Sequence, residues 1–320
     1  MKILVVRFSS IGDVVLTTPV LRCIKQQIKN VELHFLTKQT FRNVIENNIY
    51  IDKLYSIKDS LSEAISDLKK ENYDYIIDLH HNLRTFKLKL ALGKKTFSFN
   101  KLNPEKLLMV NFKINRLPQI HIVDRYFETV QSLGVTNDGK GLDHFIHEKD
   151  QINVSSYLPV HYQNGFHVLV VGGSYYTKQI PINKLKEICV QSSLPLVLVG
   201  GKEDSSIAET VHQVFPAKTF NLCGNLNINQ SASVIQQSKK VITSDTGLMH
   251  IAAAYKKDII SLWGNTIPEF GMGPYLAGNN SQLLEIKNLP CRPCSKLGYK
   301  KCPKGHFKCM NDIEIKKANF

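Results

Sequence analysis

The 320-residue sequence has no hydrophobic run long enough to cross a bilayer. Its longest apolar stretches, such as residues 168–171 and 194–199, are far shorter than the roughly 20 residues that a membrane-spanning helix needs. Low-complexity segments and internal repeats are also lacking. Because 43% of the residues are hydrophobic and 21% are charged, composition argues against a disordered or fibrous chain. The length predicts two domains of about 150 residues each.

Several common nucleotide and nucleic-acid motifs are missing. No strand pattern is followed by G-x-G-x-x-G and no G-x-x-x-x-G-K-[ST] occurs, which disfavours NAD-dependent and ATPase functions. No helix-turn-helix, zinc-finger or RNA-recognition signature accompanies the positive charge, so nucleic acid is not an expected partner. The N-terminus MKILVVRFSS lacks the apolar region and cleavage site of a signal peptide. We therefore expect it to form the first strand of a cytoplasmic protein.

Cysteine is present in an odd number, seven, which does not suggest a disulfide framework. Cys23, Cys189 and Cys223 stand alone in apolar or mixed contexts, as reduced thiols do. The other four form a cluster, Cys291-x₂-Cys294-x₇-Cys302-x₆-Cys309. This spacing departs from a simple zinc ribbon, whose second pair is also CxxC. Reduced structural thiols are the favoured interpretation, no metal is assigned, and a metal site stays an open alternative.

Positive charge is abundant and unevenly distributed. The net charge is +14. Residues 84–116 contain nine basic residues against one acid, Glu105, and residues 287–308 contain seven basic residues and no acid. A solvated surface is one explanation. The other is an anionic partner such as a phosphorylated glycan or an anionic membrane surface.

Strand and helix patterns alternate in two series separated by a polar stretch at about 137–163, which is expected to be a linker with uncertain strands. The first series is predicted as strands at 2–7, 32–37 and 73–79 and helices at 14–28, 61–70, after 82 and at 121–135. Pro19 predicts a kink or a short first helical segment. The second series is predicted as strands at 166–173, 194–201, 219–222, 240–245 and 258–264 and helices at 184–191, 205–214, 232–237 and 246–255.

Such alternation predicts an α/β protein with parallel sheets covered on both faces. Two series indicate two Rossmann-like domains, which we place at 1–160 and 161–320. In open parallel sheets ligands bind at the carboxyl ends of the strands, so the loops after the strands are where chemistry is expected.

Three such loops carry polar residues. FSSIGDVVLTTP (8–19) follows the first strand, and its Ser10, Gly12 and Asp13 stand at a helix start, where Asp13 could equally be a simple cap. VGGSYYTKQIP (171–181) offers Ser174, Thr177 and Lys178 to a phosphate, although a solvated lysine is the ordinary alternative.

The third loop, TSDTGLMHIAAA (243–254), is the most specific. It places Asp245, Thr246 and Gly247 at a strand-to-helix junction, where free N–H groups suit a diphosphate, and His250 lies one turn further along. Capping would explain the first residues and burial would explain His250.

These blocks, with DLHHNLRT (78–85), SLWGNTIPEFGMGPY (261–275) and the C-terminal CRPC, occur in an order that resembles the ADP-heptose:lipopolysaccharide heptosyltransferases, glycosyltransferase family 9. The resemblance covers nearly the whole chain. It implies a GT-B fold, with two Rossmann-like domains facing a central cleft. It also implies inverting transfer of heptose from an ADP-linked donor to the inner core of lipopolysaccharide, without a cofactor, at the cytoplasmic face of the inner membrane.

The resemblance also implies roles for individual residues. Asp13 occupies the position of the general base. Lys178 matches a donor-site lysine with Ser174 and Thr177 beside it, and the third loop matches the donor-binding block, with its members Asp245, Thr246, Gly247 and His250. The C-terminal domain would bind the donor and the N-terminal domain the acceptor.

The acceptor side rests on charge. The hypothesis is that Ser10, Gly12 and the basic group Arg84, Lys87, His121 and Arg125 contact an anionic acceptor of the lipopolysaccharide core or lipid A-Kdo type. Peripheral contact with an anionic membrane is a further expectation. The alternatives are a family 9 enzyme for another nucleotide sugar, a sugar-nucleotide epimerase, or a non-enzymatic basic module that binds anionic glycan or nucleic acid.

Overall fold

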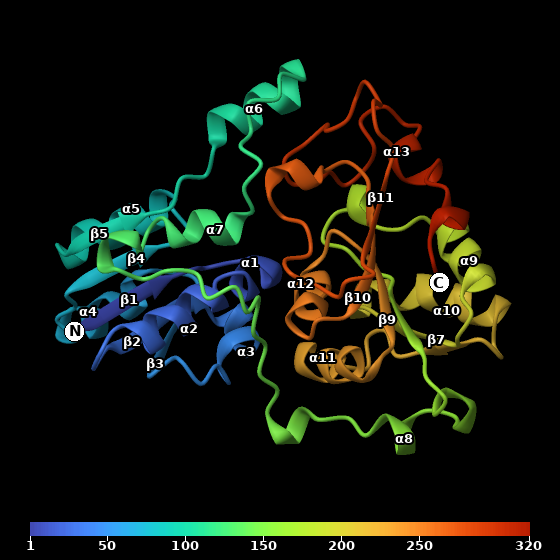
Figure 1. Ribbon diagram of the computed structural model, residues 1–320, viewed down its shortest axis with the longest axis horizontal. Coiled ribbons are helices and arrows are strands. Elements are labelled where there is room, and N and C mark those ends of the chain that lie inside the picture. Colours follow the sequence, from blue (N-terminus) through green and yellow to red (C-terminus); the bar gives the residue numbers. More distant parts are fainter. The chain divides into compact units, whose positions relative to one another are not determined.

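The computed structural model describes all residues, 1–320. The chain divides into two compact units (Figure 1). Unit 1 comprises Met1–Leu102 and Ile120–Phe145, and unit 2 comprises Asn103–Gln119 and Ile146–Phe320. The segments 103–119 and 146–160 therefore belong to unit 2.

Unit 1 is built on a five-stranded sheet in which all pairs are parallel and the order is β3-β2-β1-β4-β5. Val5 of the central strand lies opposite Phe35 on one side and Ile77 on the other. The central strands are apolar and fully buried, as expected for a sheet covered on both faces. The strands are β1 (Lys2–Val6), β2 (Glu32–Lys38), β3 (Lys53–Ile57), β4 (Tyr75–Asp78) and β5 (Lys95–Ser98).

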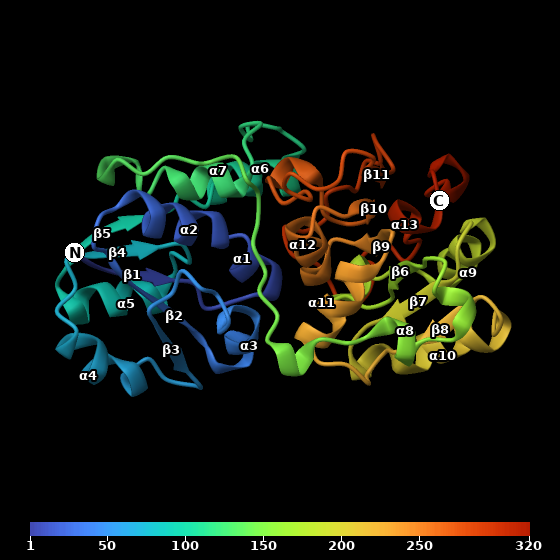
Figure 2. The ribbon, with the colours of Figure 1, turned by 60° about the horizontal axis from the view of Figure 1, so that its bottom comes forward.

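Helices cover both faces of this sheet. In Figure 2, α2 and α7 lie on one face and α4 and α5 on the other. The expected interruption at Pro19 is confirmed, since α1 ends at Val15 and Pro19 lies in the first turn of the next helix. The helices of unit 1 are α1 (Ile11–Val15), α2 (Thr18–Gln27), α3 (Arg42–Ile45), α4 (Ser62–Lys70), α5 (Leu83–Leu92) and α7 (Ile122–Phe127).

Unit 2 contains a six-stranded parallel sheet in the order β11-β10-β9-β6-β7-β8. Helices α9 and α10 pack on one face of it and α11 and α12 on the other (Figure 1). The strands are β6 (His167–Val170), β7 (Leu196–Val199), β8 (Thr219–Asn221), β9 (Lys240–Ser244), β10 (Asp258–Trp263) and β11 (Gln282–Glu285). The helices are α6 (Asn103–Phe112), α8 (Val154–Tyr157), α9 (Ile182–Gln191), α10 (Ser205–Val214), α11 (Ile228–Gln237), α12 (Gly247–Ala254) and α13 (Lys308–Asn311).

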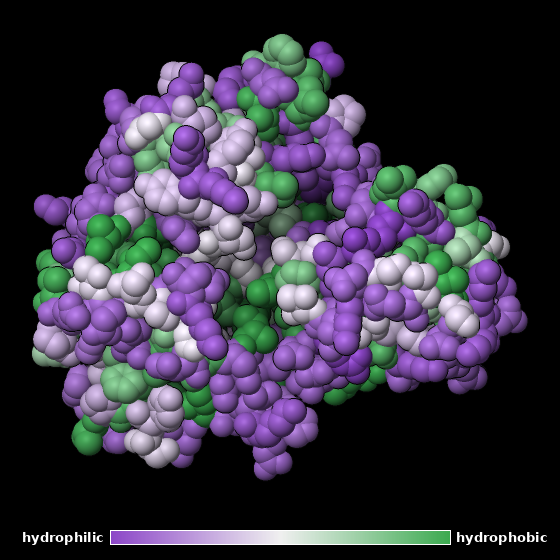
Figure 3. Space-filling view, turned by 180° about the vertical axis from the view of Figure 1, so that it is seen from behind, coloured by the Kyte–Doolittle hydropathy of each residue, from purple (hydrophilic) through white to green (hydrophobic).

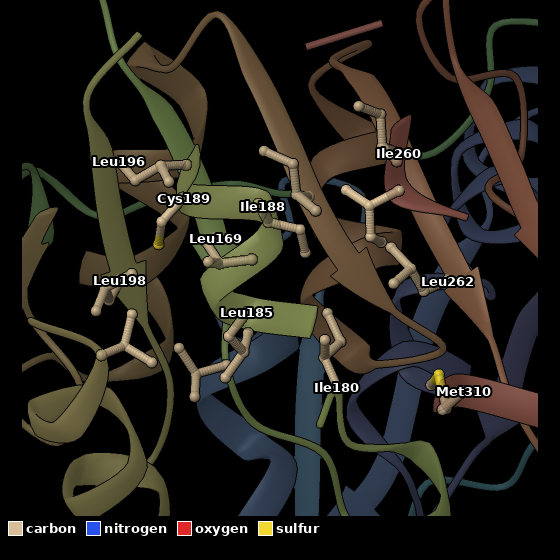
Figure 4. Packing of buried hydrophobic residues seen from close by; sticks show 14 of the residues in the cluster. Leu169, Ile180, Leu185, Ile188, Cys189, Leu196, Leu198, Ile260, Leu262 and Met310 are labelled. Carbon is tan, nitrogen blue, oxygen red and sulfur yellow. The ribbon is translucent and has the colours of Figure 1, made fainter. Parts of the chain in front are cut away.

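The core of unit 2 joins the sheet to the C-terminal segment. Leu169 and Leu198 from the strands pack with Leu185 and Ile188 of α9, and Met310 of α13 joins the same cluster (Figure 4). Each of these side chains is completely buried. The chain end after residue 300 is therefore anchored to the sheet by apolar packing.

Most predicted strands and helices are confirmed, with bounds that differ by a few residues. The segment at 137–163 contains no strand; it forms α8 and two short 3₁₀ turns. The prediction missed the edge strands β3, β5 and β11. It also missed helix α6, which buries none of its residues, and the one-turn helices α3, α8 and α13.

Candidate functional site

Each sheet has a point where the strand order reverses, and such points mark ligand sites in open α/β sheets. In unit 1 the reversal lies between β1 and β4, because the chain adds β2 and β3 on one side of β1 and β4 and β5 on the other. In unit 2 it lies between β6 and β9. The loops after β1 and β6 contain Asp13 and Lys178, and the loop after β9 contains Asp245.

Asp13 lies in α1, directly after the first strand. Its carboxylate accepts hydrogen bonds from the amide N–H of Ser10, at 3.0 Å, and from the Ser10 hydroxyl, at 2.9 Å. The other oxygen lies 2.5 Å from the Arg7 guanidinium. Asp13 is therefore held by one cation and two donors while its side chain keeps 19% exposure.

Arg7 was not singled out from the sequence, yet it is the most constrained residue of this group. Its side chain is 8% exposed. It donates hydrogen bonds to the Ser9 carbonyl at 2.8 Å, to the Tyr126 hydroxyl at 3.0 Å and to the Leu79 carbonyl. These contacts connect the loop after β1 to the loop after β4 and to α7. Arg7 is thereby fixed in position beside Asp13.

The environment of Asp13 favours its ionised form. Burial opposes ionisation, but the Arg7 charge and the Ser10 hydrogen bonds outweigh it, and the pKa of Asp13 lies below its ordinary value. Burial also acts against the Arg7 charge, and the nearby Asp13 carboxylate more than compensates, so the pKa of Arg7 is raised. Both groups are therefore charged at neutral pH.

A pocket of about 580 Å³ opens beside this group in unit 1. It brings together the predicted Arg84 and Lys87 with Lys38, which the sequence analysis missed. Arg84 lies over the Phe8 ring, 5.7 Å from its centroid. The remaining lining residues are Ser9, Asp59, Ser60, Leu61, His80, Asn82 and Leu83. Three cations and several hydroxyl and amide groups in one concave site suit an anionic, hydroxyl-rich ligand.

His80 contributes to this pocket as a neutral side chain. Burial, together with the nearby Arg7 and Lys101 charges, lowers the pKa of His80 to about 3. Its ring packs edge-on against Phe8 at 5.2 Å. A neutral imidazole can donate one hydrogen bond and accept another, as sugar hydroxyls require.

The other predicted acceptor residues make contacts within unit 1, and their acceptor role stays a prediction. Gly12 is buried within α1, and Ser10 is the N-cap that also holds Asp13. His121 caps α7 by accepting a hydrogen bond from the Val123 amide at 3.2 Å. Arg125 is 3% exposed and lies over the Phe99 ring. Neither His121 nor Arg125 lines the pocket.

In unit 2 the structure brings together two of the predicted donor residues. The Lys178 ammonium lies 2.6 Å from the Asp245 carboxylate, which also accepts a hydrogen bond from the Thr266 hydroxyl at 2.8 Å. The side chains of Lys178 and Asp245 are 18% and 11% exposed. Thr266 follows β10, and its place in the loop after a strand was the signal that could have identified it.

Thr177 connects the loop after β6 to the C-terminal segment. It is 1% exposed, and its hydroxyl accepts a hydrogen bond from the Tyr299 amide at 2.8 Å. The Thr177 amide in turn donates to the Tyr299 carbonyl at 3.2 Å. Ser174 is exposed. Gly172 is required by close approach, because a Cβ there would lie 2.0 Å from an Asp204 carboxylate oxygen.

The third loop forms the start of α12. Thr246 is the N-cap, and its hydroxyl accepts a hydrogen bond from the Met249 amide at 3.4 Å. Gly247 is the first residue of the helix, and its small size leaves the N-terminal amides approachable. His250 is 2% exposed and lies within the helix.

Arg292, from the C-terminal basic stretch, has a structural role. Its guanidinium donates to the carbonyls of Gly264 at 2.6 Å and Thr266 at 2.9 Å, and it pairs with Glu285 at 2.7 Å. It thus fixes the loop that carries Thr266. Sequence pattern gave no signal for this contact, because the partners lie more than 20 residues away.

Potential metal ligands gather elsewhere. The group whose ligand atoms all lie within 4.8 Å of one another is Glu32, His34 and Glu71. Lys2 and Lys53 already bind Glu71, at 2.7 and 2.5 Å, so this group is an ion-pair network of the sheet that extends from the buried His34 to the exposed Glu32. Among the clustered cysteines, Cys309 belongs to the core, and burial raises the pKa of its thiol to about 12. The Cys291 sulfur lies 3.9 Å from His306 Nε2.

Comparison with known proteins identifies the family of this chain. The family model described as glycosyltransferase family 9 (heptosyltransferase) matches residues 62–301. The chain belongs to glycosyltransferase family 9. It is therefore an enzyme that transfers a sugar.

Relatives of this family 9 enzyme match along its whole length. Lipooligosaccharide heptosyltransferase 2 of Campylobacter jejuni is 26% identical over 338 residues, which cover 99% of this chain and 96% of that protein. The structure of the Escherichia coli ADP-heptose LPS heptosyltransferase II matches with a TM-score of 0.69, 17% identity and 98% coverage of both chains. The Escherichia coli heptosyltransferase WaaC solved with ADP matches with a TM-score of 0.66 and 22% identity, covering 88% of this chain and 92% of that one.

These structural matches confirm the predicted fold class. The family 9 enzyme has the GT-B fold, with two Rossmann-like units and parallel sheets. None of its helices combines the length and the apolarity that a membrane span requires.

Proposed function

We propose that this family 9 enzyme transfers a heptose from an ADP-linked donor to the inner core of lipopolysaccharide, with inversion at the anomeric carbon. The observation that carries the proposal is the Asp13 carboxylate, held ionised and partly exposed at the reversal point of the unit 1 sheet. Similarity to heptosyltransferases of lipooligosaccharide and lipopolysaccharide supports the substrate class. The neighbour solved with ADP supports an adenine nucleotide.

We assign the acceptor to unit 1 and the donor to unit 2. In the pocket of unit 1, Arg84, Lys87 and Lys38 would bind phosphate or carboxylate groups of the acceptor. In unit 2, Lys178 would leave Asp245 for the donor diphosphate, and the free amides at the start of α12 would bind the same group. Asp245 and Thr266 would then hold sugar hydroxyls.

The reaction proposed is a single displacement. The acceptor hydroxyl oxygen forms a bond to the anomeric carbon while the bond from that carbon to the diphosphate oxygen breaks, and ADP leaves with the electron pair. The hydroxyl proton passes to the Asp13 carboxylate. Lys178 stabilises the charge that develops on the leaving diphosphate. The sugar is inverted because one attack replaces one leaving group.

The donor half of the proposal is tested by calorimetric binding of ADP-heptose, ADP, UDP and UDP-linked sugars. We expect adenine nucleotides alone to bind, and Lys178→Ala to weaken that binding by about tenfold or more, because it removes a charged contact to the diphosphate. Lys202→Ala is the matched control, since Lys202 is exposed in the loop after β7. If a uridine sugar binds and adenine nucleotides do not, the donor is a UDP-linked sugar and the proposed ADP-linked donor is wrong.

The acceptor and the stereochemistry are tested by product analysis. The chain is incubated with ADP-linked β-heptose and a heptose-deficient inner-core acceptor, and the product is examined by mass spectrometry and NMR. We expect one added heptose with the α configuration. A β-linked product would exclude the single displacement, and turnover of the donor without an acceptor would favour an epimerase.

A further inference from the structure

Helix α6 carries large apolar side chains and fully buries none of its residues. Its sequence NPEKLLMVNF contains four consecutive apolar residues, and at 100° per residue four in a row face all sides of a helix. Leu107 is 54% exposed and Phe112 is 63% exposed. Apolar side chains that gather at an exposed surface commonly mark a site that binds protein or membrane. Within unit 2, the Lys106 ammonium lies over the Phe270 ring, 5.9 Å from its centroid, whereas Leu107 and Phe112 stay exposed.

The segment after α6 and the C-terminal loop join it in one surface. The Lys113 ammonium donates a hydrogen bond to the Pro293 carbonyl at 2.6 Å, and Lys296 approaches the Asn103 side chain at 3.5 Å. Ile114, Leu297 and Tyr299 expose 48%, 55% and 42% of their area. We call residues 103–116 and 296–301 the α6 surface. Figure 3 shows exposed hydrophobic residues, in green, among hydrophilic ones along the upper edge of the molecule.

The charge of the α6 surface is positive. Exposed cations Arg116, Lys296, Lys300 and Lys301 stand among its apolar side chains. Its one acid is Glu105, and one of the Glu105 carboxylate oxygens is buried. Large apolar side chains surrounded by lysines and arginines are what a peripheral protein presents to an anionic bilayer, because the apolar groups enter the interface and the cations meet the head groups.

We propose that the α6 surface docks on an anionic phospholipid bilayer. A second copy of the chain fits less well, since it would bring two positively charged surfaces together. This inference deepens the proposed function, since a lipid-linked acceptor is reached at a bilayer surface. Vesicle binding itself requires neither donor nor acceptor, so it is tested independently.

The experiment measures sedimentation of the full chain with vesicles of phosphatidylcholine, with and without phosphatidylglycerol. We expect binding only to the anionic vesicles, reduced by raised salt. The triple variant Leu107→Ser, Phe112→Ser and Ile114→Ser should reduce the partition coefficient at least about tenfold, because the apolar area that enters the interface is lost. The control makes the same change at three exposed valines of unit 2, Val160, Val190 and Val214.

A second pair of variants tests the cations. Lys296→Glu, Lys300→Glu and Lys301→Glu together should abolish binding to anionic vesicles. The control set changes the total charge by the same amount at exposed positions outside the α6 surface, with Lys202→Glu, Lys316→Glu and Lys317→Glu. This control set should retain most of the binding to anionic vesicles. Loss of binding in both sets alike would overturn the proposal, as would equal binding to neutral vesicles.

Two further measurements distinguish membrane docking from a protein–protein interface and from the proposed transfer activity. Sedimentation equilibrium without lipid should find the same oligomeric state for the wild type and the apolar triple variant; a dimer that the variant dissociates would instead identify a protein interface. Transfer to a water-soluble acceptor without acyl chains should be unchanged in the variant. If the wild type binds vesicles but transfers no heptose, the proposed function fails and the docking surface stands.

Discussion

The two reversal points of the sheets each pair one carboxylate with one cation, but they hold the pair differently. In unit 1 the guanidinium of Arg7 is buried and donates to two carbonyls, one hydroxyl and Asp13. In unit 2 the ammonium of Lys178 pairs with Asp245 and keeps 18% exposure. The first cation is fixed by four contacts within unit 1, and the second is a partly exposed lysine held by one ion pair.

This difference suits the two proposed roles, a general base in unit 1 and a phosphate-binding group in unit 2. A general base needs a constant position and a constant charge, and the fixed Arg7 provides both for Asp13. A phosphate-binding group must exchange its partner when the ligand arrives, and a lysine with three rotatable donors can do so. We therefore expect substitutions at Arg7 to affect folding and pH dependence, and substitutions at Lys178 to affect donor affinity and transfer rate with little effect on folding.

The largest effect is expected from Asp13→Asn. Without the base, the transfer rate should fall by about 10² to 10⁴-fold, because the amide cannot take the acceptor proton. Donor affinity measured by calorimetry should be unchanged, since the donor residues lie in unit 2. Asp59→Asn, which changes a carboxylate that lines the pocket, is the control and should keep most of the activity. Equal losses of activity in both variants would show that Asp13 is not the general base.

Arg7→Met should alter the pH dependence of transfer. Arg7 lowers the pKa of Asp13, whereas burial raises it. With Arg7 gone, burial dominates, so the acidic limb of kcat/KM should move to higher pH. Arg7→Lys keeps the positive charge and should leave that limb close to its wild-type position. If the limb does not move in Arg7→Met, Asp13 is not the group that titrates.

Arg7→Met should also be less stable than the wild type, and the difference in the free energy of unfolding should depend on pH. Asp13 has a depressed pKa in the folded chain, so its pairing stabilises the fold above the unfolded value of about 3.9 and is lost as pH falls through the folded value. Removing one partner of a buried pair should lower the free energy of unfolding by about 3 kcal/mol at pH 7. Denaturant unfolding at pH 7 and pH 3 should show a smaller difference from wild type at the lower pH. Lys178→Ala should be nearly as stable as wild type.

A smaller effect is expected from charge reversal in the pocket of unit 1. Arg84→Glu combined with Lys87→Glu should raise the acceptor KM by about tenfold or more and leave donor affinity unchanged, because both side chains line the pocket. Lys94→Glu with Lys95→Glu changes the same charge just beyond α5, outside the pocket lining, and serves as the control. An unchanged acceptor KM in the first pair would place the acceptor elsewhere.

The comparison also shows what sequence could predict. Asp13, Lys178 and Asp245 could be singled out because each follows a strongly apolar strand, and within unit 2 the sheet topology brings the segments of Lys178 and Asp245 together. Arg7 was missed although it precedes Asp13 by only six residues, because its partner Tyr126 lies 119 residues away. His121 and Arg125 have the right charge but cap and pack α7. Local pattern carries no information on such long-range burial.

The missed elements have a related cause. The edge strands β3 and β5 are only partly buried, so their apolar and polar residues do not form the continuous runs that marked the central strands. Helix α6 does not separate its apolar and polar residues onto different sides, so periodicity could not indicate it. The four consecutive apolar residues that break the helical period belong to the proposed docking surface.

The smallest effect we predict tests how Arg7 itself is held. Tyr126→Phe removes the hydroxyl that accepts from Arg7 at 3.0 Å and should lower the free energy of unfolding by about 1 kcal/mol. Tyr73→Phe is a matched control, because the buried Tyr73 hydroxyl bonds to His34, at 2.9 Å, in the same unit. Both variants should lose similar stability in denaturant unfolding, whereas only Tyr126→Phe should lower kcat, since it loosens the guanidinium that positions Asp13. If transfer is equally fast in both, the Arg7 contacts to Leu79 and Ser9 suffice to hold the base, and the fixed character of the unit 1 pair does not depend on α7.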